Sequence, residues 1–377
     1  MTRRANNEGS VFQRKDGRWV AAITLGYAGG RLRRKSAIAV TKADAKRRLR
    51  ELQQAAEQGL ALAPDPTLAD YLRKWLAEAA PRTLRPRTLA GYTSIVERHL
   101  IPALGRIRLC KLHPGDIDTY LNRVVESGLT TRTAQYHHAV LRRALGQAER
   151  WGYVGRNVAR LVTPAQVRQR DMAPLTPDQA RLFLAGIASD RLQALYAVSL
   201  SLGLRQGEAL GLTWADVDLD ARTITVRRTL QRYCGAYHLD DPKTQRSRRT
   251  ISLPAPLAEA LRQHRVRQNE ERLRAGPLWA GDWNLLFCNE IGNPLAGAEV
   301  TRRFQAKLIA LGLPRQRFHD LRHAAATFLL AQGVPLRVVM EILGHSTITT
   351  TANVYGHVLP ELQRDAMDGQ GAYLFGS

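Results

Sequence analysis

The stretch from 319 to 358 reads HDLRHAAATFLLAQGVPLRVVMEILGHSTITTTANVYGHV. It contains His319, Arg322, His345 and Tyr355 among residues that are mostly apolar or uncharged. The pattern predicts His319 and Arg322 at the start of one helix. It predicts His345 at a glycine turn and Tyr355 on the helix after that turn. Cationic, proton-transferring and hydroxyl groups gathered in this way indicate half of a reactive site, whose other half must come from elsewhere in the chain.

The charge of the chain points to a polyanionic partner. The net charge is +23 and the isoelectric point is near 10.8, an excess that favours nucleic acid. Charge alone does not distinguish DNA from RNA or from an acidic membrane surface. Of the 56 basic residues, 48 are arginine and 8 are lysine, a bias that genomic base composition explains without any function.

No segment indicates a membrane span, a secretory signal or a metal site. No stretch approaches the roughly 20 apolar residues that cross a bilayer, and the first ten residues lack the apolar core of a signal peptide. The three cysteines, Cys110, Cys234 and Cys288, lie far apart without metal-binding spacing. We therefore expect buried or incidental thiols, no bound metal and a cytoplasmic protein.

Residues 1–64 are predicted to form a small separate domain. A helix from Thr41 to about Gln58 follows three β-rich runs, which span 10–13, 19–25 and 32–40. Fourteen Lys and Arg against five Asp and Glu give this part a net charge of +9. We expect four basic residues of its sheet to enter a DNA groove: Arg31, Arg33, Arg34 and Lys35. A basic sheet face that is merely solvated is the alternative.

Residues 65–165 are predicted to form an all-helical domain. Helical periodicity recurs at 68–78, 87–99, 114–126 and 131–151. Breaks are expected at Pro81 to Pro86 and at Pro102 to Gly105. A bundle of this length is well within the size of a domain.

A polar, basic hinge at 163–174 leads to a third domain, residues 174–377. Its first helix is capped by Thr176 and has a proline in the first turn. A β-hairpin region from Thr223 to Leu253 is followed by more helices. The predicted fold is therefore multidomain, with a mainly α third domain that contains a small β-sheet, preceded by the helical bundle and by the three-stranded sheet with one helix.

Four short motifs in the third domain carry the chemistry. The first, SLGLRQGEALGLTWADVDL, contains Arg205 and Glu208, and the second, DPKTQRSRRTISLP, contains Lys243. The third is HDLRH at 319–323. The fourth is LGHS at 343–346, followed by a tyrosine ten residues after its histidine.

These motifs resemble those of the tyrosine recombinases, the family of phage and transposon integrases, whose pattern is Arg, Lys, His-x-x-Arg, His or Trp, and Tyr. The resemblance covers roughly 174–360 and fills all six positions in order. It implies six catalytic residues: Arg205, Lys243, His319, Arg322, His345 and Tyr355. The helical domain resembles the core-site-binding domain of the family more loosely. The first domain resembles the arm-site-binding domain only by its strands, helix and charge.

The resemblance also implies an activity and partners. The protein would cleave and rejoin DNA strands through a 3′-phosphotyrosyl intermediate, integrating or excising a mobile element without a cofactor. Its partners would be double-stranded DNA, with core and arm sites, and other copies of itself in a homotetramer. An accessory DNA-bending or directionality factor is a further candidate partner.

The chemistry of the residues agrees with these roles. Arg205 and Arg322 suit a phosphate clamp, because a guanidinium stays charged and can bind two oxygens at once. A tyrosine has an ordinary pKa near 10 and needs help to act as a nucleophile. His319 would act as the base for Tyr355, and His345 would donate to a phosphate oxygen.

Lys243 is one of only two lysines from 174 to 377, a region rich in arginine. An ammonium can release its proton, whereas an arginine cannot readily do so. A lysine at this position therefore fits a general acid that protonates the leaving 5′ oxygen. Lys307, in a helical stretch, is expected to be solvated.

Two acidic residues are expected to support the site. Glu208 and Asp320 lie next to the arginine and histidine positions and would orient them. Helix capping or plain surface charge is the alternative for both.

Three other functions remain open from sequence alone. A chromosome-dimer resolvase-like recombinase would not need the basic first domain, and a type IB topoisomerase would reseal the same strand. A non-enzymatic regulator could use Val334 to Ile348 as a helix-turn-helix, but would need neither Lys243 nor Tyr355. The sequence does not predict the attachment site, the host element, the need for accessory factors or the use of separate arm sites. It also does not predict whether Tyr355 acts in its own protomer or in a neighbouring one.

Overall fold

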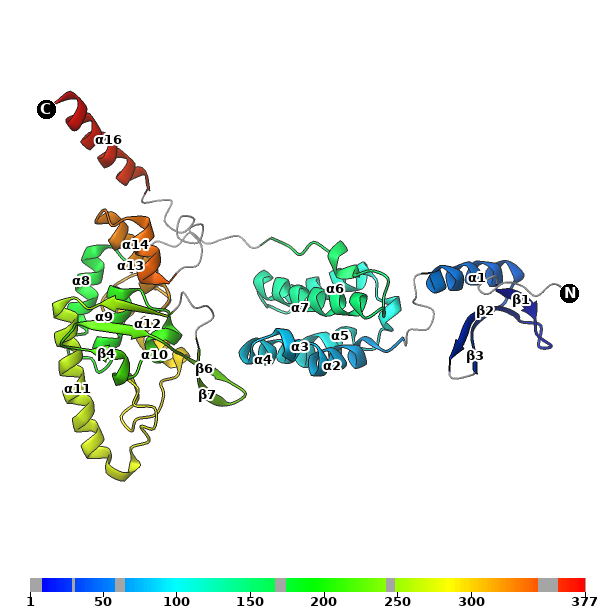
Figure 1. Ribbon diagram of the computed structural model, residues 1–377, viewed down its shortest axis with the longest axis horizontal. Coiled ribbons are helices and arrows are strands. Elements are labelled where there is room, and N and C mark those ends of the chain that lie inside the picture. The colour runs from blue at the N-terminus through cyan, green and yellow to red at the C-terminus, as the bar shows by residue number, and fades with distance from the viewer. Residues whose placement is uncertain are drawn as a thin grey trace. The chain divides into compact units, whose positions relative to one another are not determined.

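The computed structural model describes residues 9–28, 31–57, 65–166, 174–241, 248–344 and 359–376. The chain divides into two compact units, 1–169 and 170–377 (Figure 1). It is mostly helical with small antiparallel sheets, as predicted. Among the described helices, none has the length and apolarity needed to cross a membrane. The finer division into domains at 1–64, 65–165 and 174–377 stays a prediction.

A three-stranded antiparallel sheet, β1-β2-β3, begins the first unit. The strands are β1 (Ser10–Gln13), β2 (Trp19–Ala28) and β3 (Arg31–Ala39), and α1 (Lys42–Glu57) follows them. The small core between sheet and helix is built of Ala21, Ala39 and Ala45. β2 ends later and β3 begins earlier than predicted, because the two strands pair again after a register shift between Thr24 and Tyr27.

The four basic residues predicted to contact DNA lie along β3. Arg34 and Lys35 are exposed. The Arg34 guanidinium lies 5.6 Å from the ring centroid of Phe12 and donates to Ser10 Oγ (3.3 Å). Packing of an arginine against an exposed aromatic ring orients the side chain along the sheet face.

The rest of the described first unit is helical. Its α-helices are α2 (Leu68–Glu78), α3 (Ala80–Thr83), α4 (Pro86–Ile95), α5 (Ile101–Leu104), α6 (Pro114–Glu126) and α7 (Thr131–Arg150), and a π-helical turn, Val96–Leu100, joins α4 to α5. The break predicted from Pro81 to Pro86 falls at Leu84 and Arg85, between α3 and α4, whereas Pro81 and Pro102 themselves do not interrupt a helix. Each proline occupies the first turn of a short helix, where its missing N–H costs no hydrogen bond.

A buried polar pair joins α6 to α7. The hydroxyl of Tyr120 and Nδ1 of His137 are 2.7 Å apart, and the His137 ring lies 4.7 Å from that of His99. His137 is 2% exposed. Burial, and secondarily the nearby His99, lowers the pKa of His137 to about 4. The histidine is therefore neutral in the folded protein at pH 7.

We expect the free energy of unfolding to fall as the pH is lowered from about 6.5 to about 4. In that range unfolded His137 binds a proton and folded His137 does not, so acid favours the unfolded state. Urea unfolding of the wild type and of His137→Gln at pH 7 and pH 5 measures this. The wild type should lose more stability between the two pH values than the variant. An equal loss in both proteins would contradict the assignment.

The second unit contains eight described α-helices and five strands. The helices are α8 (Pro177–Gly186), α9 (Gln193–Leu202), α10 (Gln206–Leu210), α11 (Ala255–Ala275), α12 (Gly297–Ala310), α13 (Asp320–Ala331), α14 (Leu336–Leu343) and α16 (Leu359–Phe375), with one-turn 3₁₀ segments between some of them. The strands are β4 (Val217–Asp218), β5 (Thr223–Val226), β6 (Thr229–Tyr233), β7 (Ala236–Asp240) and β8 (Arg249–Ser252).

The core of this unit surrounds α9, which is buried along almost its whole length. Its Tyr196 packs with rings from three other segments, Phe183, Phe304 and Phe318, at centroid distances of 5.7 to 6.2 Å. A helix that is apolar all round belongs in the centre of a domain. α9 is therefore the scaffold on which the ends of the surrounding helices are placed.

The region from 223 to 253 is not one hairpin, as the sequence indicates, but parts of two sheets. β6 and β7 form a tight hairpin, whose turn residues Cys234 and Gly235 both have positive φ. β5 instead pairs with β4 and β8. The buried alternate residues Ile224, Val226 and Ile251 explain this, because they need the same core face.

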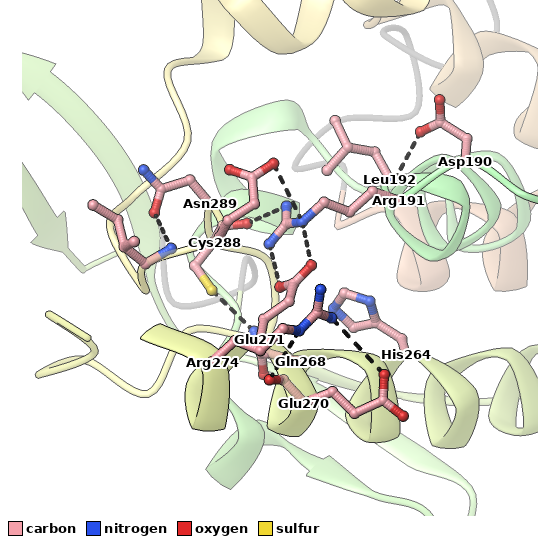
Figure 2. A network of polar contacts seen from close by, with 12 residues as sticks. Asp190, Arg191, Leu192, His264, Gln268, Glu270, Glu271, Arg274, Cys288 and Asn289 are labelled. Carbon is pink, nitrogen blue, oxygen red and sulfur yellow. Dashed lines mark hydrogen bonds and ion pairs between the residues drawn. The ribbon is translucent and has the colours of Figure 1, made fainter. Parts of the chain in front are cut away.

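A polar network anchors the start of α9 to α11, and Figure 2 shows its members. Arg191 donates from Nε and Nη2 to the two carboxylate oxygens of Glu271 (2.7 Å each) and from Nη1 to the carbonyl of Cys288 (2.7 Å). Lys307, expected to be solvated, has a side chain that is 44% exposed and also forms an ion pair with Asp190 (2.8 Å). These contacts hold the end of α9 that lies away from Gly203.

Candidate active site

Arg205 stands at the junction of two helices. α9 is capped by Gly203, whose left-handed backbone (φ 60°) turns the chain, and Arg205 is the N-cap of α10. Its backbone N–H donates to Glu208 Oε2 (3.1 Å), and its Nη1 donates to Glu208 Oε1 (2.6 Å). Two bonds to the residue three positions later hold the arginine in one orientation. Its side chain is 39% exposed, so the guanidinium can reach a ligand.

Glu208 is a buried carboxylate between two guanidinium groups. Its side chain is 5% exposed, and Arg249 Nη2 donates to Oε2 (3.1 Å) on the side away from Arg205 Nη1. Burial tends to raise the pKa of Glu208, but Arg249 and Arg205 outweigh it and hold the pKa below its ordinary value. Glu208 thus stays ionised beside Arg205, and its supporting role in the reaction stays a prediction.

His319 and Arg322 lie at the start of α13, with His319 as the N-cap and Arg322 in the first turn. Residues three apart on a helix share a face. Arg322 is 2% exposed and donates from Nη1 to the carbonyl of Gly203 (2.8 Å). A buried guanidinium held by a backbone carbonyl has a restricted orientation.

His319 is neutral at pH 7. Burial lowers its pKa to about 4, and the neighbouring His323 and Arg322 add to the effect. The rings of His319 and His323 meet edge to face, 5.2 Å apart. A neutral imidazole can accept a proton, although a pKa near 4 makes it a weak base. An anion bound beside it would raise that pKa and strengthen the base.

Two glycines bring three of the four motifs together. Gly203 accepts from Arg322, as described above. Gly344, which ends α14 in a left-handed conformation (φ 66°), accepts from Arg205 Nη2 (3.2 Å). The first, third and fourth motifs therefore meet. The remaining predicted catalytic residues lie outside the described residues, and their positions stay predictions: Lys243, His345 and Tyr355.

Asp320 bonds to the residue three positions before it, and its supporting role stays a prediction. Its Oδ2 accepts from the backbone N–H of Arg317 (2.7 Å), and an ion pair joins its carboxylate to the Arg317 guanidinium (3.3 Å). Asp320 is 4% exposed. These bonds close the turn that leads into α13, so Asp320 contributes to the site by fixing where His319 begins the helix.

Arg249 lies in the second motif and belongs to the site, although the family pattern does not single it out. It begins β8, and its side chain is 7% exposed. Burial lowers the pKa of Arg249, and the adjacent Glu208 opposes this shift. The sequence holds one signal for its burial: Arg249 alternates with Ile251 and Leu253, which face the core.

Comparison with protein-family models gives two matches. Residues 174–361 match the phage integrase family, and residues 67–125 match the N-terminal SAM-like domain of phage integrases. The first match contains every residue of the site described above.

Similar proteins cover nearly the whole chain. An integrase from Streptomyces ambofaciens is 34% identical over 97% of this chain and 97% of its own. A tyrosine recombinase XerC-like protein from Caldanaerobacter subterraneus subsp. tengcongensis is 29% identical over 92% of this chain and 94% of its own. A solved structure of the Tn1549 transposon integrase, in complex with transposon right end DNA, is 26% identical, with a TM-score of 0.68 over 80% of this chain and 98% of that one.

The fold, the arginine and histidine site and these matches define a tyrosine site-specific recombinase. Within that class, the chain belongs to the phage integrase family. Its activity is accordingly site-specific recombination, by integration or excision.

Proposed function

We propose that Arg205 and Arg322 clamp the scissile phosphate of duplex DNA and that Tyr355 attacks its phosphorus. The tyrosine oxygen forms a bond to phosphorus, and the bond from phosphorus to the 5′ oxygen breaks. His319 takes the tyrosine proton, and Lys243 gives a proton to the leaving 5′ oxygen. The products are a 3′-phosphotyrosyl link and a free 5′-hydroxyl, and a 5′-hydroxyl from a partner strand reverses the step.

The observation that carries this proposal is the meeting of Arg205 and Arg322 around Gly203. The two arginines are 117 positions apart in the sequence. Arg205 lies two residues after Gly203, which ends α9, and Arg322 donates to the carbonyl of Gly203. Two guanidinium groups held by the fold can stabilise charge that grows on the equatorial phosphate oxygens in the transition state. His345 would add a further donor to a non-bridging oxygen.

The basic first part of the chain would add DNA contacts outside the cleaved site. We assign core-site binding to residues 65–165 and arm-site binding to residues 1–64, through Arg31, Arg33, Arg34 and Lys35. The exposed Arg34 and Lys35 support the arm-site assignment. The DNA complex of the Tn1549 transposon integrase supports DNA binding by the 80% of this chain that it matches. Contacts of this kind to phosphates supply affinity, whereas base contacts supply sequence specificity.

Assembly follows from the chemistry. Recombination of two duplexes exchanges four strands, and each strand needs one tyrosine. We therefore assign a homotetramer on two DNA sites, acting in the cytoplasm, with an accessory DNA-bending or directionality factor as a further partner. Energy of the broken bond is kept in the phosphotyrosyl link, so rejoining draws on no nucleotide cofactor.

A nicked duplex tests the proposal. The substrate is a duplex of the DNA that flanks the gene, nicked close to the cleavage position, so that cleavage releases a short fragment and rejoining fails. We expect a covalent protein–DNA adduct that survives denaturing electrophoresis. Specific binding without any adduct would instead favour a non-enzymatic DNA-binding regulator.

A further inference from the structure

Arg249 links three segments of the candidate site. It begins β8, its Nη2 donates to Glu208 Oε2 (3.1 Å), and its Nε donates to the carbonyl of Ile342 near the end of α14. Arg249 thus reaches the first motif through Glu208 and the fourth motif through the backbone of α14. Both contacts are made by a side chain that is 7% exposed.

We propose that Arg249 is a positioning residue for strand cleavage, which fixes the Arg205 guanidinium through Glu208 and fixes the α14 turn through Ile342. The proposal rests on the function proposed above. Arg249 is buried behind these groups, so it would act through them rather than on the phosphate.

Glu208 transmits the first effect. Its Oε2 accepts from Arg249 and also from the backbone N–H of Arg205, while its Oε1 accepts from Arg205 Nη1. Without Arg249, both carboxylate oxygens are held by Arg205 alone, and the carboxylate loses its link to β8. The Arg205 guanidinium would move with it, because the same carboxylate holds both its backbone and its side chain.

Gly344 transmits the second effect. Arg205 donates to its carbonyl, and a Cβ added at Gly344 would lie 2.9 Å from Arg249 Nη1. The Arg249 side chain therefore lies against the glycine turn as well as bonding Ile342 before it. His345 is the next residue in the sequence after this turn.

The geometry requires a guanidinium rather than any cation. Nε and Nη2 of Arg249 donate in different directions, one to a backbone carbonyl and one to a carboxylate. A lysine has a single nitrogen on a flexible stem. Arg249→Lys would keep the buried charge next to Glu208 but would lose one of the two links.

Arg191→Lys is the matched control. Arg191 also pairs with a largely buried carboxylate, Glu271 (14% exposed), and also donates to a backbone carbonyl, that of Cys288. It lies at the opposite end of α9 from Gly203, roughly 15 Å away along a ten-residue helix. Replacing a guanidinium that bonds both a carboxylate and a backbone carbonyl by a lysine is therefore common to both variants, although Arg191 is 21% exposed and Arg249 is 7% exposed.

The measurement is single-turnover adduct formation on the nicked duplex at saturating protein, with the affinity for the same duplex and the thermal midpoint measured in parallel. We expect Arg249→Lys to cleave about ten- to a hundredfold more slowly, a range typical of small misplacements of catalytic groups. Its affinity should stay within about twofold of the wild type. Arg191→Lys should cleave at the wild-type rate.

A second variant keeps the test decisive if Arg249→Lys does not fold. Arg249→Gln removes the charge but keeps a donor, and it should show the same loss of rate at unchanged affinity. In the double variant with Glu208→Gln, the fold loss of cleavage rate should be much smaller than the product of the losses in the two single variants, because both changes break one network.

Three results would overturn the proposal. The first is a wild-type cleavage rate in folded Arg249→Lys and Arg249→Gln, and the second is an equal loss of rate in Arg191→Lys. The third is a loss of affinity as large as the loss of rate, which would make Arg249 a direct phosphate contact. Absence of any adduct with the wild type is distinguishable from these results, because it defeats the proposed function itself.

Discussion

Tyr355→Phe is expected to abolish the covalent adduct on the nicked duplex completely. The substitution removes one oxygen and keeps the ring, so it removes the atom that bonds to phosphorus and leaves packing almost unchanged. No other group of the proposed site can form a 3′-phosphotyrosyl link. DNA affinity should stay within about twofold of the wild type, because the arginines that bind phosphate are retained.

Tyr373→Phe is the control for this result. Tyr373 lies on α16 in the same C-terminal part of the chain and is 89% exposed. Its variant should form the adduct at the wild-type rate. An adduct that persists in Tyr355→Phe, or that disappears in Tyr373→Phe, would assign the nucleophile elsewhere.

Lys243→Ala is expected to slow cleavage of an ordinary phosphodiester by about 10² to 10⁴-fold, the usual contribution of a general acid or base. A substrate with a 5′-bridging sulfur should be cleaved by Lys243→Ala nearly as fast as by the wild type. The reason is that a thiol, with an ordinary pKa near 8.5, leaves as an anion without receiving a proton. Adduct formation on the two substrates measures the effect.

Lys307→Ala is the matched control, since Lys307 is the other lysine between 174 and 377. Its ion pair with Asp190 lies at the start of α9, away from the arginine site. The variant should cleave both substrates at the wild-type rate. Failure of the bridging sulfur to restore cleavage by Lys243→Ala would exclude the general-acid role.

Local features of the site could be predicted from the sequence. The spacing of Arg205 and Glu208 is that of a helix cap with its partner three residues later, and this is the bond observed. The start of α13 at His319 was predictable from the same kind of local pattern. Such features depend on residues within one helical turn, so sequence spacing determines them.

Long-range features could not be predicted. The contact between Arg322 and Gly203 spans 119 positions, and it depends on a left-handed turn that only the packing of α9 positions. Arg249 is one of many arginines in its motif, and charge counts do not tell which of them is buried. The bond from Asp320 to Arg317 could not be predicted either, because Arg317 precedes the helix and belongs to no motif.

The sheet was mispredicted for a related reason. A run of β-forming residues from 223 to 253 indicates strands but does not indicate which strands pair. Burial of Ile224, Val226 and Ile251 on one face draws β8 to β5 and leaves β6 and β7 as a separate hairpin. That pairing places Arg249 next to Glu208, so the missed sheet topology and the missed site residue have one cause.

Identification of the residue and the DNA end joined in the adduct tests the central claim most directly. Trypsin cuts after Arg337 and Arg364, which releases a peptide, 338–364, whose only tyrosine is Tyr355. Mass spectrometry of the nuclease-treated adduct should find this peptide carrying a 3′-linked nucleotide on Tyr355, and the released DNA fragment should end in a 5′-hydroxyl. A nucleotide on another residue, or a link through a 5′ phosphate, would contradict the account.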